Sequence, residues 1–284
     1  MQLVSICIPT YEGDKYLQEA LDSVKKQTYK NIEVIISDDD SKDTTLSICE
    51  KFKKEVDFPV FIYRHKPNGI GANWNHCIRK ANGDYIKFLF QDDVLQSNCI
   101  EKQVLASQDS CLKAICSKRT IINDNSIIVE DGDWFAKYGD LQKNINFGDK
   151  SVYVFEKKDL KSLPYLVYNQ FGEPDTFLYS KDLFKELGFF NEKYNQILDL
   201  EYTYRILKKH PIGLMKDNLL SFRVHTGQAS TKTANIQLQE HKELIGMIQS
   251  NFFSYLSSKE RKNYLLKKYK VLAKIYYLKK KYFK

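Results

Sequence analysis

Short apolar segments alternate with amphipathic segments through the first third of the chain, and this alternation limits the folds that it can adopt. The short runs are rich in β-branched and aromatic residues, which is typical of strands, whereas the longer ones repeat apolar residues at helical spacing. The expected strands and the helices between them cover residues 3–8, 15–27, 32–36, 44–53, 60–63, 72–80 and 85–90. This order predicts βαβ units, and therefore an α/β fold with a mostly parallel sheet flanked by helices.

Two adjacent carboxylates, Asp92 and Asp93, follow the last of these strands. In open α/β sheets, ligands bind beyond the carboxyl ends of the strands, where this pair is expected. Neighbouring residues of an extended chain point in opposite directions, so one carboxylate can contact a sugar hydroxyl while the other faces Mg²⁺ or Mn²⁺. The alternative is that the pair only caps the next helix. Asp38–Asp40 and Asp199 are expected on the same rim, which favours a binding site.

The pattern is less regular beyond residue 94. A polar stretch with scattered aromatic residues, 130–169, favours no element, whereas its neighbours predict helices and short strands. These expected elements cover residues 98–107, 112–116, 120–129, 176–179, 181–187, 199–209, 212–216 and 219–222. From residue 237 onward the pattern is helical, with a break near Ser257. We therefore expect one large α/β domain with a helical C-terminal tail.

Composition excludes several classes of protein. The chain has 284 residues, 43% of them hydrophobic, which suffices for a substantial core. Six cysteines are scattered without a Cys-x-x-Cys pair or a histidine spacing suited to zinc, so we expect reduced thiols in a cytosolic protein. No apolar run approaches the length of a membrane-spanning helix, and the N-terminus lacks the layout of a signal peptide.

Positive charge is concentrated at the C-terminus. Residues 259–284 hold eleven Lys or Arg residues and one Glu, a net charge of +10, so the rest of the chain carries about −2 of the total of +8. Leu265, Tyr269, Leu272 and Tyr276 follow a helical repeat and would share one face. Basic amphipathic helices with aromatic residues bind anionic membrane surfaces, which we expect here. The alternative is a helix packed on the domain; nothing else indicates nucleic-acid binding.

Four motifs occur in order along the chain. They are SICIPTY at 5–11, DDDSKDT at 38–44, the stretch from Asn68 to ANGDYI at 81–86, and FFNE at 189–192 continuing to Arg205. Together they resemble the motifs of family 2 inverting glycosyltransferases, which have the GT-A fold and include enzymes of bacterial surface polysaccharides such as lipopolysaccharide and capsule.

Three positions depart from that family's pattern. The family often has Asp-x-Asp-Asp where this chain has 90–93, Phe-Gln-Asp-Asp. It usually has Glu-Asp where this chain has Leu198-Asp199, and Gly where it has Asp40. The first two departures leave the implied metal ligand and base in place, so activity is still expected.

The resemblance implies which residues bind the donor. Pro9, Thr10, Tyr11 and Asp39 would line the pocket for the nucleotide base, with Asp39 accepting a hydrogen bond from the N–H of a uracil-type ring. Asp92 would contact the ribose or the donor sugar.

The resemblance also implies the metal ligands and the base. Asp93 would bind the Mn²⁺ or Mg²⁺ that bridges the diphosphate, and His225 could assist it or be an ordinary surface histidine. Asp199 would accept the proton of the acceptor hydroxyl while the new bond forms opposite the diphosphate, which inverts the anomeric centre. Asp199 could instead only cap a helix in which Glu201 and Arg205 form an i,i+4 pair.

Other polar residues are expected to be structural. Ser41 is a plausible N-cap for the helix at 44–53. Asp38 is expected to be structural rather than ligand-binding, and Asp40 and Asp43 are expected to serve the turn and the cap. His65 and His76 have no evident partner. The segment 173–175, Glu-Pro-Asp, either begins an acceptor-binding loop or forms a turn before the next strand.

We therefore expect an inverting, metal-dependent glycosyltransferase that moves a sugar from a nucleotide-diphosphate donor, in the first place a UDP-sugar, to a hydroxyl of a glycan or lipid-linked glycan. Residues 1–94 would bind the nucleotide, 95–230 the acceptor, and 231–284 would hold the protein at the inner face of the cell membrane. A sugar nucleotidyltransferase would need a glycine-rich basic loop where this chain has Pro9–Glu12. The remaining alternative is a catalytically silent module that binds nucleotide sugars or docks at membranes in a glycan-assembly complex.

Overall fold

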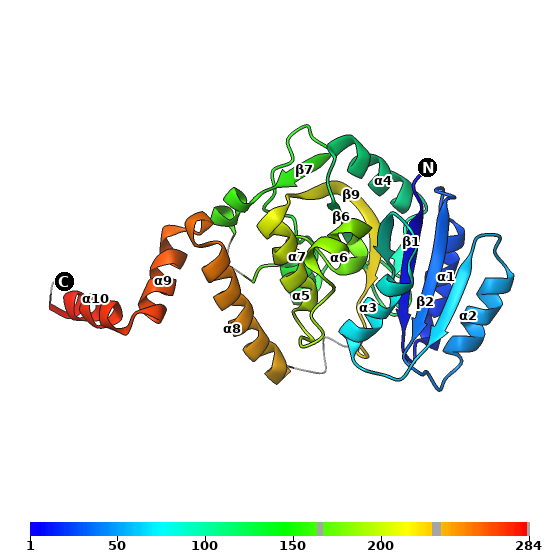
Figure 1. The fold of residues 1–284 in the computed structure, drawn as a ribbon, viewed down its shortest axis with the longest axis horizontal. Coiled ribbons are helices and arrows are strands. Elements are labelled where there is room, and N and C mark those ends of the chain that lie inside the picture. The colour runs from blue at the N-terminus through cyan, green and yellow to red at the C-terminus, as the bar shows by residue number, and fades with distance from the viewer. Residues whose placement is uncertain (164–166, 229–233, 283–284) are drawn as a thin grey trace.

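The computed structural model describes residues 1–163, 167–228 and 234–282, and it contains one mixed sheet (Figure 1). The strands are β1 (Val4–Thr10), β2 (Ile32–Asp38), β3 (Val60–Arg64), β4 (Tyr85–Phe88), β5 (Val94–Leu95), β6 (Ala114–Ile122), β7 (Val152–Phe155), β8 (Phe177–Ser180) and β9 (Ile212–Arg223). Their order is β3-β2-β1-β4-β8-β6-β9-β5, with β7 also on β9. The first four strands in this order are parallel, and β8 is antiparallel to both of its neighbours. The α/β fold is confirmed, although the sheet is more mixed than expected.

Helices cover both faces of the sheet. They are α1 (Asp14–Lys25), α2 (Thr45–Lys54), α3 (Ile70–Lys80), α4 (Cys99–Ser110), α5 (Gly132–Tyr138), α6 (Lys181–Leu187), α7 (Leu198–Lys209), α8 (Ala234–Asn251), α9 (Ser258–Lys268) and α10 (Lys270–Tyr282). Residues of α1, α2 and α4 form one apolar core on one face, and residues of α3, α6, α7 and α8 form a second core on the other. Strand residues alternate between these cores, as the pleat requires.

The amphipathic pattern of α1 is confirmed. Leu17, Ala20, Leu21 and Val24 lie on one side of the helix and are at most 1% exposed. Full burial of each large apolar side chain is worth about 1.5–3 kcal/mol, so this face anchors the helix to the sheet. The helix expected at 181–187 is also observed, and it ends at Gly188, whose φ of 79° is readily adopted only by glycine.

The sequence predicted four short strands where the structure has two long ones, β6 and β9. β6 continues through Lys118 and Arg119, and β9 continues through Lys216–Asn218, where polar residues suggested loops. The pairing of the two strands shifts register at Lys118, which is a bulge. A bulge changes the direction of the side chains without ending the strand. The polar residues at this bulge therefore lie within β6 and do not mark its end.

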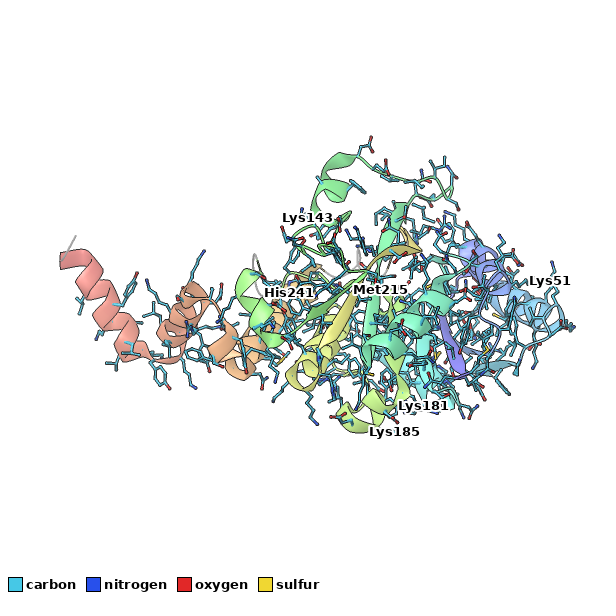
Figure 2. All side chains as sticks on the ribbon, turned by 90° about the horizontal axis from the view of Figure 1, so that it is seen from above. Lys51, Lys143, Lys181, Lys185, Met215 and His241 are labelled. Atoms are coloured by element: carbon cyan, nitrogen blue, oxygen red, sulfur yellow. The ribbon has the colours of Figure 1, made fainter. Side chains whose placement is uncertain are left out.

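Helices α9 and α10, residues 258–282, form an arm that extends from the domain, as two views show (Figures 1 and 2). Ser257 caps α9 by accepting a hydrogen bond from the amide of Glu260, which confirms the expected break. A second break at Tyr269 was not expected. It divides the predicted apolar face between α9 and α10. No helix in the described part of the chain is long and apolar enough to span a bilayer. The expected domain boundary near residue 230 lies outside the described residues.

Candidate active site

The expected rim is present at the carboxyl ends of several strands. Thr10 ends β1 and pairs in register with Asp38 at the end of β2. Asp92 follows β4, and Arg223 ends β9 and donates a hydrogen bond from Nε to the carbonyl of Asp92 at 2.8 Å. His225 lies two residues further on. The sequence motifs that resembled donor-binding segments therefore converge on one edge of the sheet.

Asp39 is buried at this rim with an unused hydrogen-bond acceptor. Its backbone N–H donates to the carbonyl of Thr10 at 2.9 Å, while its carboxylate Oδ1 accepts no hydrogen bond and lies 3.2 Å from Nδ1 of His65. The His65 Nδ1–H instead donates to the carbonyl of Lys66 at 3.1 Å. Burial raises the pKa of Asp39, and the nearby His65 acts in the opposite direction. A buried acceptor without a partner is costly, so this oxygen is suited to a ligand N–H.

His65, expected to be structural, belongs to the network around Asp39. Its Nε2 lies 3.0 Å from Oγ of Ser37 and 3.3 Å from Oδ1 of Asn73. Asn73 in turn donates to the carbonyl of Thr10 at 3.2 Å. Because these residues come from β1, β2, α3 and the loop after β3, sequence spacing gave no sign of the network.

The structural role expected of Asp38 is confirmed. Its two carboxylate oxygens accept hydrogen bonds from the amide and hydroxyl of Ser41 and from the hydroxyl of Thr10, at 2.6–2.9 Å. The expectation that Ser41 caps the next helix was wrong, because Asp38 binds it and α2 starts one turn later. Asp43 does accept from the amide of Thr45 at 3.0 Å. Asp40, where the family usually has Gly, has a φ of 62°.

Gln91 fixes the loop after β1. Its side chain accepts a hydrogen bond from the Tyr11 amide at 2.9 Å and donates to the Tyr11 carbonyl at 3.1 Å. Pro9 lies within β1, and Tyr11 is 51% exposed. The ring of Tyr11 is therefore accessible at the rim beside Asp39, while its backbone is held.

Asp92 and Asp93 point in different directions. Asp92 reaches Nε2 of His225 with Oδ2 at 3.0 Å, and both side chains are partly accessible. Asp93 is only 1% exposed, and its Oδ1 accepts a hydrogen bond from the amide of Arg223 at 2.7 Å. The expected difference in orientation is observed, but it arises in a turn rather than in an extended chain, because the amide of Asp93 donates to the carbonyl of Phe90 at 3.2 Å. The roles assigned to the two carboxylates stay predictions.

Beneath Asp93 lies a second buried carboxyl group, Asp175. Burial raises the pKa of Asp93 well above its usual range, and the charges of Asp175 and Asp92 raise it further. Burial also raises the pKa of Asp175 to about 7. Like charges this close favour sharing one proton. Lys87, fully buried in β4, donates to the carbonyl of Asp175 at 2.5 Å.

Asp199 lies in the first turn of α7, at the other end of the site. Burial raises its pKa to about 7, and the charge of Glu173 acts in the same direction, while the amides of the helix start lower it. Glu201 and Arg205 form the expected i,i+4 ion pair at 2.8 Å. Arg205 also donates to the carbonyls of Leu187 and Phe189, so this pair joins α7 to α6.

Glu173 is held by an arginine that sequence reasoning missed. Nε and Nη2 of Arg119 donate to its two carboxylate oxygens at 2.6 and 3.0 Å, and Nη1 donates to the carbonyls of Tyr138 and Gly139. Arg119 is 7% exposed. Such a bidentate, desolvated pair fixes the orientation of Glu173, whose charge acts on Asp199. Glu173 is the N-cap of a 3₁₀ turn at Pro174–Thr176, so the turn interpretation is confirmed.

The two departures from the family pattern are packed into the core. The Phe90 ring stacks on Trp74 of α3 with centroids 5.0 Å apart, and Leu198 is 3% exposed. A Cβ at Gly71 would lie 3.3 Å from Cδ1 of Leu198 and 3.2 Å from Cα of Glu192, so a larger residue there would push α3 slightly away from these two residues. Apolar residues replace acids here without leaving an unpaired polar group.

Comparison with known proteins agrees with this geometry. Residues 5–188 match the family model described as glycosyl transferase family 2. The chain belongs to this family. An uncharacterized glycosyltransferase of Rickettsia typhi is 30% identical over 262 residues, which are 91% of this chain and 74% of that protein. Glycosyltransferase GlyA of Streptococcus pneumoniae is 26% identical over 233 residues, 80% of this chain and 31% of that protein.

The share of each relative's length that this family 2 chain covers varies between relatives. An uncharacterized glycosyltransferase of Rickettsia felis is 31% identical over 261 residues, but the chain spans only 39% of it. The structure of TarS residues 1–349 from S. aureus in complex with UDP-GlcNAc superposes with a TM-score of 0.65 at 19% identity, covering 88% of this chain and 66% of that one. A complex of TarS with UDP gives a TM-score of 0.63. These likenesses establish the GT-A fold.

Proposed function

We propose that the protein is an inverting glycosyltransferase that uses a UDP-sugar donor and transfers the sugar to a hydroxyl group of a glycan. The observation that carries this proposal is the pairing of a buried, unpartnered acceptor on Asp39 at one end of the rim with a base of raised pKa, Asp199, near the other. Asp92 and His225 lie on the same rim. Family membership and the TarS complexes with UDP and UDP-GlcNAc support the donor class.

Asp39 would recognise the base. Its free Oδ1 can accept a hydrogen bond from the imide N–H of uracil, a donor that cytosine lacks at the same ring position. Tyr11, exposed beside it, offers an aromatic face for the flat ring. Removing a hydrogen bond to a charged group costs about 1.5–3 kcal/mol, so this one contact can favour uridine over cytidine by roughly 10-fold or more.

Asp92 and His225 fit a divalent cation better than Asp93 does. A carboxylate oxygen and an imidazole nitrogen are ligands that Mn²⁺ accepts, and they already lie 3.0 Å apart across the rim. Asp93 is buried and its Oδ1 is occupied by the Arg223 amide, so we assign it a supporting role. The donor diphosphate would complete the coordination. When bound, the cation neutralises charge on the leaving diphosphate.

Asp199 would be the base in a single displacement. Its carboxylate accepts the proton of the acceptor hydroxyl while that oxygen bonds to the anomeric carbon from the face opposite the diphosphate. The bond to the diphosphate oxygen breaks, UDP leaves with the electron pair, and the configuration inverts. A pKa near 7 makes the carboxylate a stronger proton acceptor than an exposed aspartate, yet leaves much of it ionised at neutral pH.

A panel of nucleotide sugars, titrated calorimetrically with Mn²⁺ or with EDTA, tests the proposal. We expect one uridine donor to bind, more tightly with Mn²⁺, and to release UDP slowly by hydrolysis. Asp39→Ala should weaken UDP binding by roughly 10-fold or more. Asp40→Gly is the matched control, because it removes the neighbouring carboxylate while retaining the left-handed backbone. Binding without any UDP release would indicate a silent module, and no binding of any donor or of UDP would refute the proposal.

The arm would contact an anionic membrane, which suits a lipid-linked acceptor. Apolar side chains on its described part are exposed, including Val271 at 71%, Leu278 at 50% and Tyr269 at 47%. They lie among the lysines that give residues 259–284 a net charge of +10. Exposed apolar residues beside a basic surface are the combination that binds the interface of anionic bilayers.

A further inference from the structure

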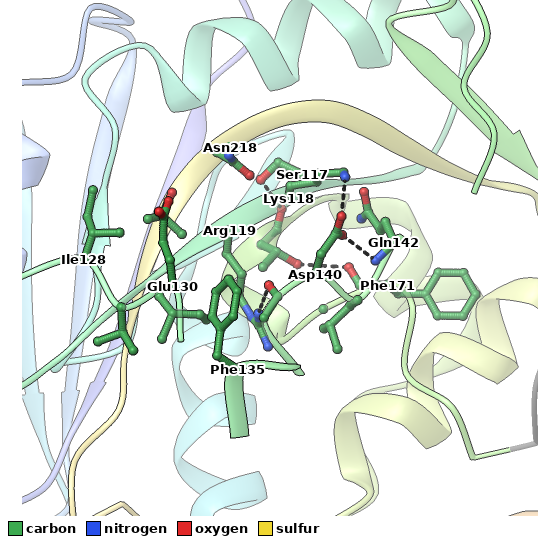
Figure 3. A pocket seen from close by; sticks show the side chains of 17 residues that line it. Ser117, Lys118, Arg119, Ile128, Glu130, Phe135, Asp140, Gln142, Phe171 and Asn218 are labelled. Atoms are coloured by element: carbon green, nitrogen blue, oxygen red, sulfur yellow. Dashed lines mark hydrogen bonds and ion pairs between the residues drawn. The ribbon is translucent and has the colours of Figure 1, made fainter. Parts of the chain in front are cut away.

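A hollow of about 180 Å³ lies beside β6, and no role in donor binding accounts for it (Figure 3). We call it the β6 hollow. One wall is formed by residues 117–121 of β6 and another by the segments 128–130 and 139–142. Phe135 of α5, Phe171, Gly172, Thr176 and Asn218 complete the lining. The volume is below the roughly 300–1,000 Å³ of pockets for drug-sized ligands, so it suits a group of about one sugar ring.

The cationic groups of the β6 hollow are already neutralised. Lys118 Nζ lies 2.9 Å from Oδ2 of Asp140, and the Arg119 guanidinium is bound by both oxygens of Glu173. These cations have little remaining capacity for a phosphate or another anion. A charged ligand would have to break a buried ion pair, which typically costs several kcal/mol.

Two free hydrogen-bond acceptors line the hollow. Gln142 is 3% exposed, and its Oε1 accepts no hydrogen bond. Within the part of the chain that the structure describes, the carboxylate of Glu130 forms no ion pair, and it is exposed to solvent. Figure 3 shows the ring of Phe135 beside Arg119, where it gives the hollow an apolar surface. Such a lining suits an uncharged ligand that has many O–H donors and an apolar ring face.

The β6 hollow adjoins the catalytic end of the rim. Gly172 lines it and directly precedes Glu173, whose charge acts on Asp199. Thr176, which also lines the hollow, directly follows Asp175. The residues on either side of 173–175 therefore line the hollow, while Glu173 itself acts on Asp199.

We propose that the β6 hollow is an acceptor subsite that binds an uncharged sugar unit adjacent to the one that is glycosylated. This rests on the proposed function, because it presumes that Asp199 receives a proton from an acceptor sugar. The acceptor then extends from Asp199 past the 173–175 turn and along β6. Hydroxyl groups of the bound unit donate to Gln142 and Glu130, and its apolar face packs on Phe135.

Methyl glycosides of disaccharides built from the common hexoses, N-acetylhexosamines and deoxyhexoses are suitable probes, because one unit can occupy the hollow while the adjacent unit is glycosylated. Their binding is measured by saturation-transfer NMR in the presence of UDP, and their use as acceptors is measured by UDP release from the donor identified above. We expect at least one glycoside to bind, and Phe135→Ala and Glu130→Gln to raise its KM by roughly 10-fold, which corresponds to about 1.4 kcal/mol each. Gln142→Ala should have the same effect.

Two matched controls lie outside the β6 hollow. Phe61→Ala removes an exposed ring from β3, and Glu50→Gln neutralises an exposed carboxylate of α2. Neither should change the KM for the glycoside, and calorimetric titration of UDP shows whether each variant is folded. If no glycoside binds, or if the hollow and control variants have equal KM values, the acceptor subsite is refuted. Absence of UDP binding in the wild type would instead refute the proposed function.

Discussion

At the scale of single residues, two opposing effects act on the carboxylate of Asp199. Burial and the charge of Glu173 favour the protonated form, whereas the amides at the start of α7 favour the ionised form. Burial dominates, and the pKa rises to about 7. The same residue can therefore begin a helix and accept a proton, so the capping and catalytic interpretations are compatible.

We expect turnover to depend on this ionisation. Because only ionised Asp199 can accept a proton, kcat should fall as the pH drops below about 7 and level off above it. Asp199→Asn should lower kcat by roughly 10²–10⁴-fold and remove the pH dependence. UDP titration should give the same affinity for both proteins. A flat pH profile in the wild type, or normal turnover by the variant, would contradict the assignment.

Local sequence motifs predicted only some of the residues at the candidate site. Asp39, Asp92 and Asp199 could be proposed because each belongs to a local motif of a few residues. Arg119, His65 and the other members of the networks were missed, since their contacts join segments far apart in the chain. Arg223 and Glu19, for example, are 204 positions apart in the chain, yet Nη2 of Arg223 lies 2.5 Å from Oε2 of Glu19. No local pattern marks such a pair.

At the scale of elements, β9 supports the turn that carries the two aspartates. Arg223 at its end is 1% exposed and binds Asp92 through Nε, while Nη1 donates to the Asn123 carbonyl and to Oγ of Ser126 at 2.9 Å. The guanidinium also lies over the ring of Tyr16, 4.6 Å from its centroid. One buried side chain thus joins α1, the turn after β4, the loop after β6 and β9.

Arg223→Lys should loosen this junction. Lysine keeps the charge but lacks the planar guanidinium whose Nε, Nη1 and Nη2 each donate to a different partner, so Asp92 would lose its fixed position relative to His225. We expect the affinity for Mn²⁺, measured by electron paramagnetic resonance with UDP present, to fall by roughly 10–100-fold. Arg205→Lys is the matched control, because Arg205 also binds backbone carbonyls but joins α6 to α7. Equal Mn²⁺ affinities for the two variants would show that Arg223 has no positioning role.

The elements with clear periodicity were predicted well, and those shaped by tertiary contacts were not. The helix at 181–187 and the first strands depend on local patterns, and they appear almost as expected. β5 has two residues and exists only because Val94 and Leu95 pair with β9. α5 and β7 lie in a stretch without an apolar repeat, so packing against the rest of the domain specifies them.

At the scale of the whole molecule, the arm separates a basic, partly apolar surface from the catalytic rim. Removal of residues 259–284 should abolish sedimentation with vesicles of phosphatidylglycerol and phosphatidylcholine. In the full chain, Val271→Asp should weaken the same interaction, because this exposed side chain would enter the bilayer interface. Pure phosphatidylcholine vesicles serve as the neutral control. Unchanged sedimentation of the truncated protein would contradict membrane binding by the arm.

The position of β9 also affects the order in which the site can be assembled during translation. β1 to β4 can pair once the first 88 residues have left the ribosome, because their partners are close in sequence. β5 and the Asp92–Asp93 turn must wait for β9, and Arg223 is translated 130 positions after Asp93. A nascent chain can therefore complete the part of the fold that would hold the nucleotide well before the end that would bind the cation. Translation that stops before residue 212 would leave β6 with an unpaired edge that can aggregate.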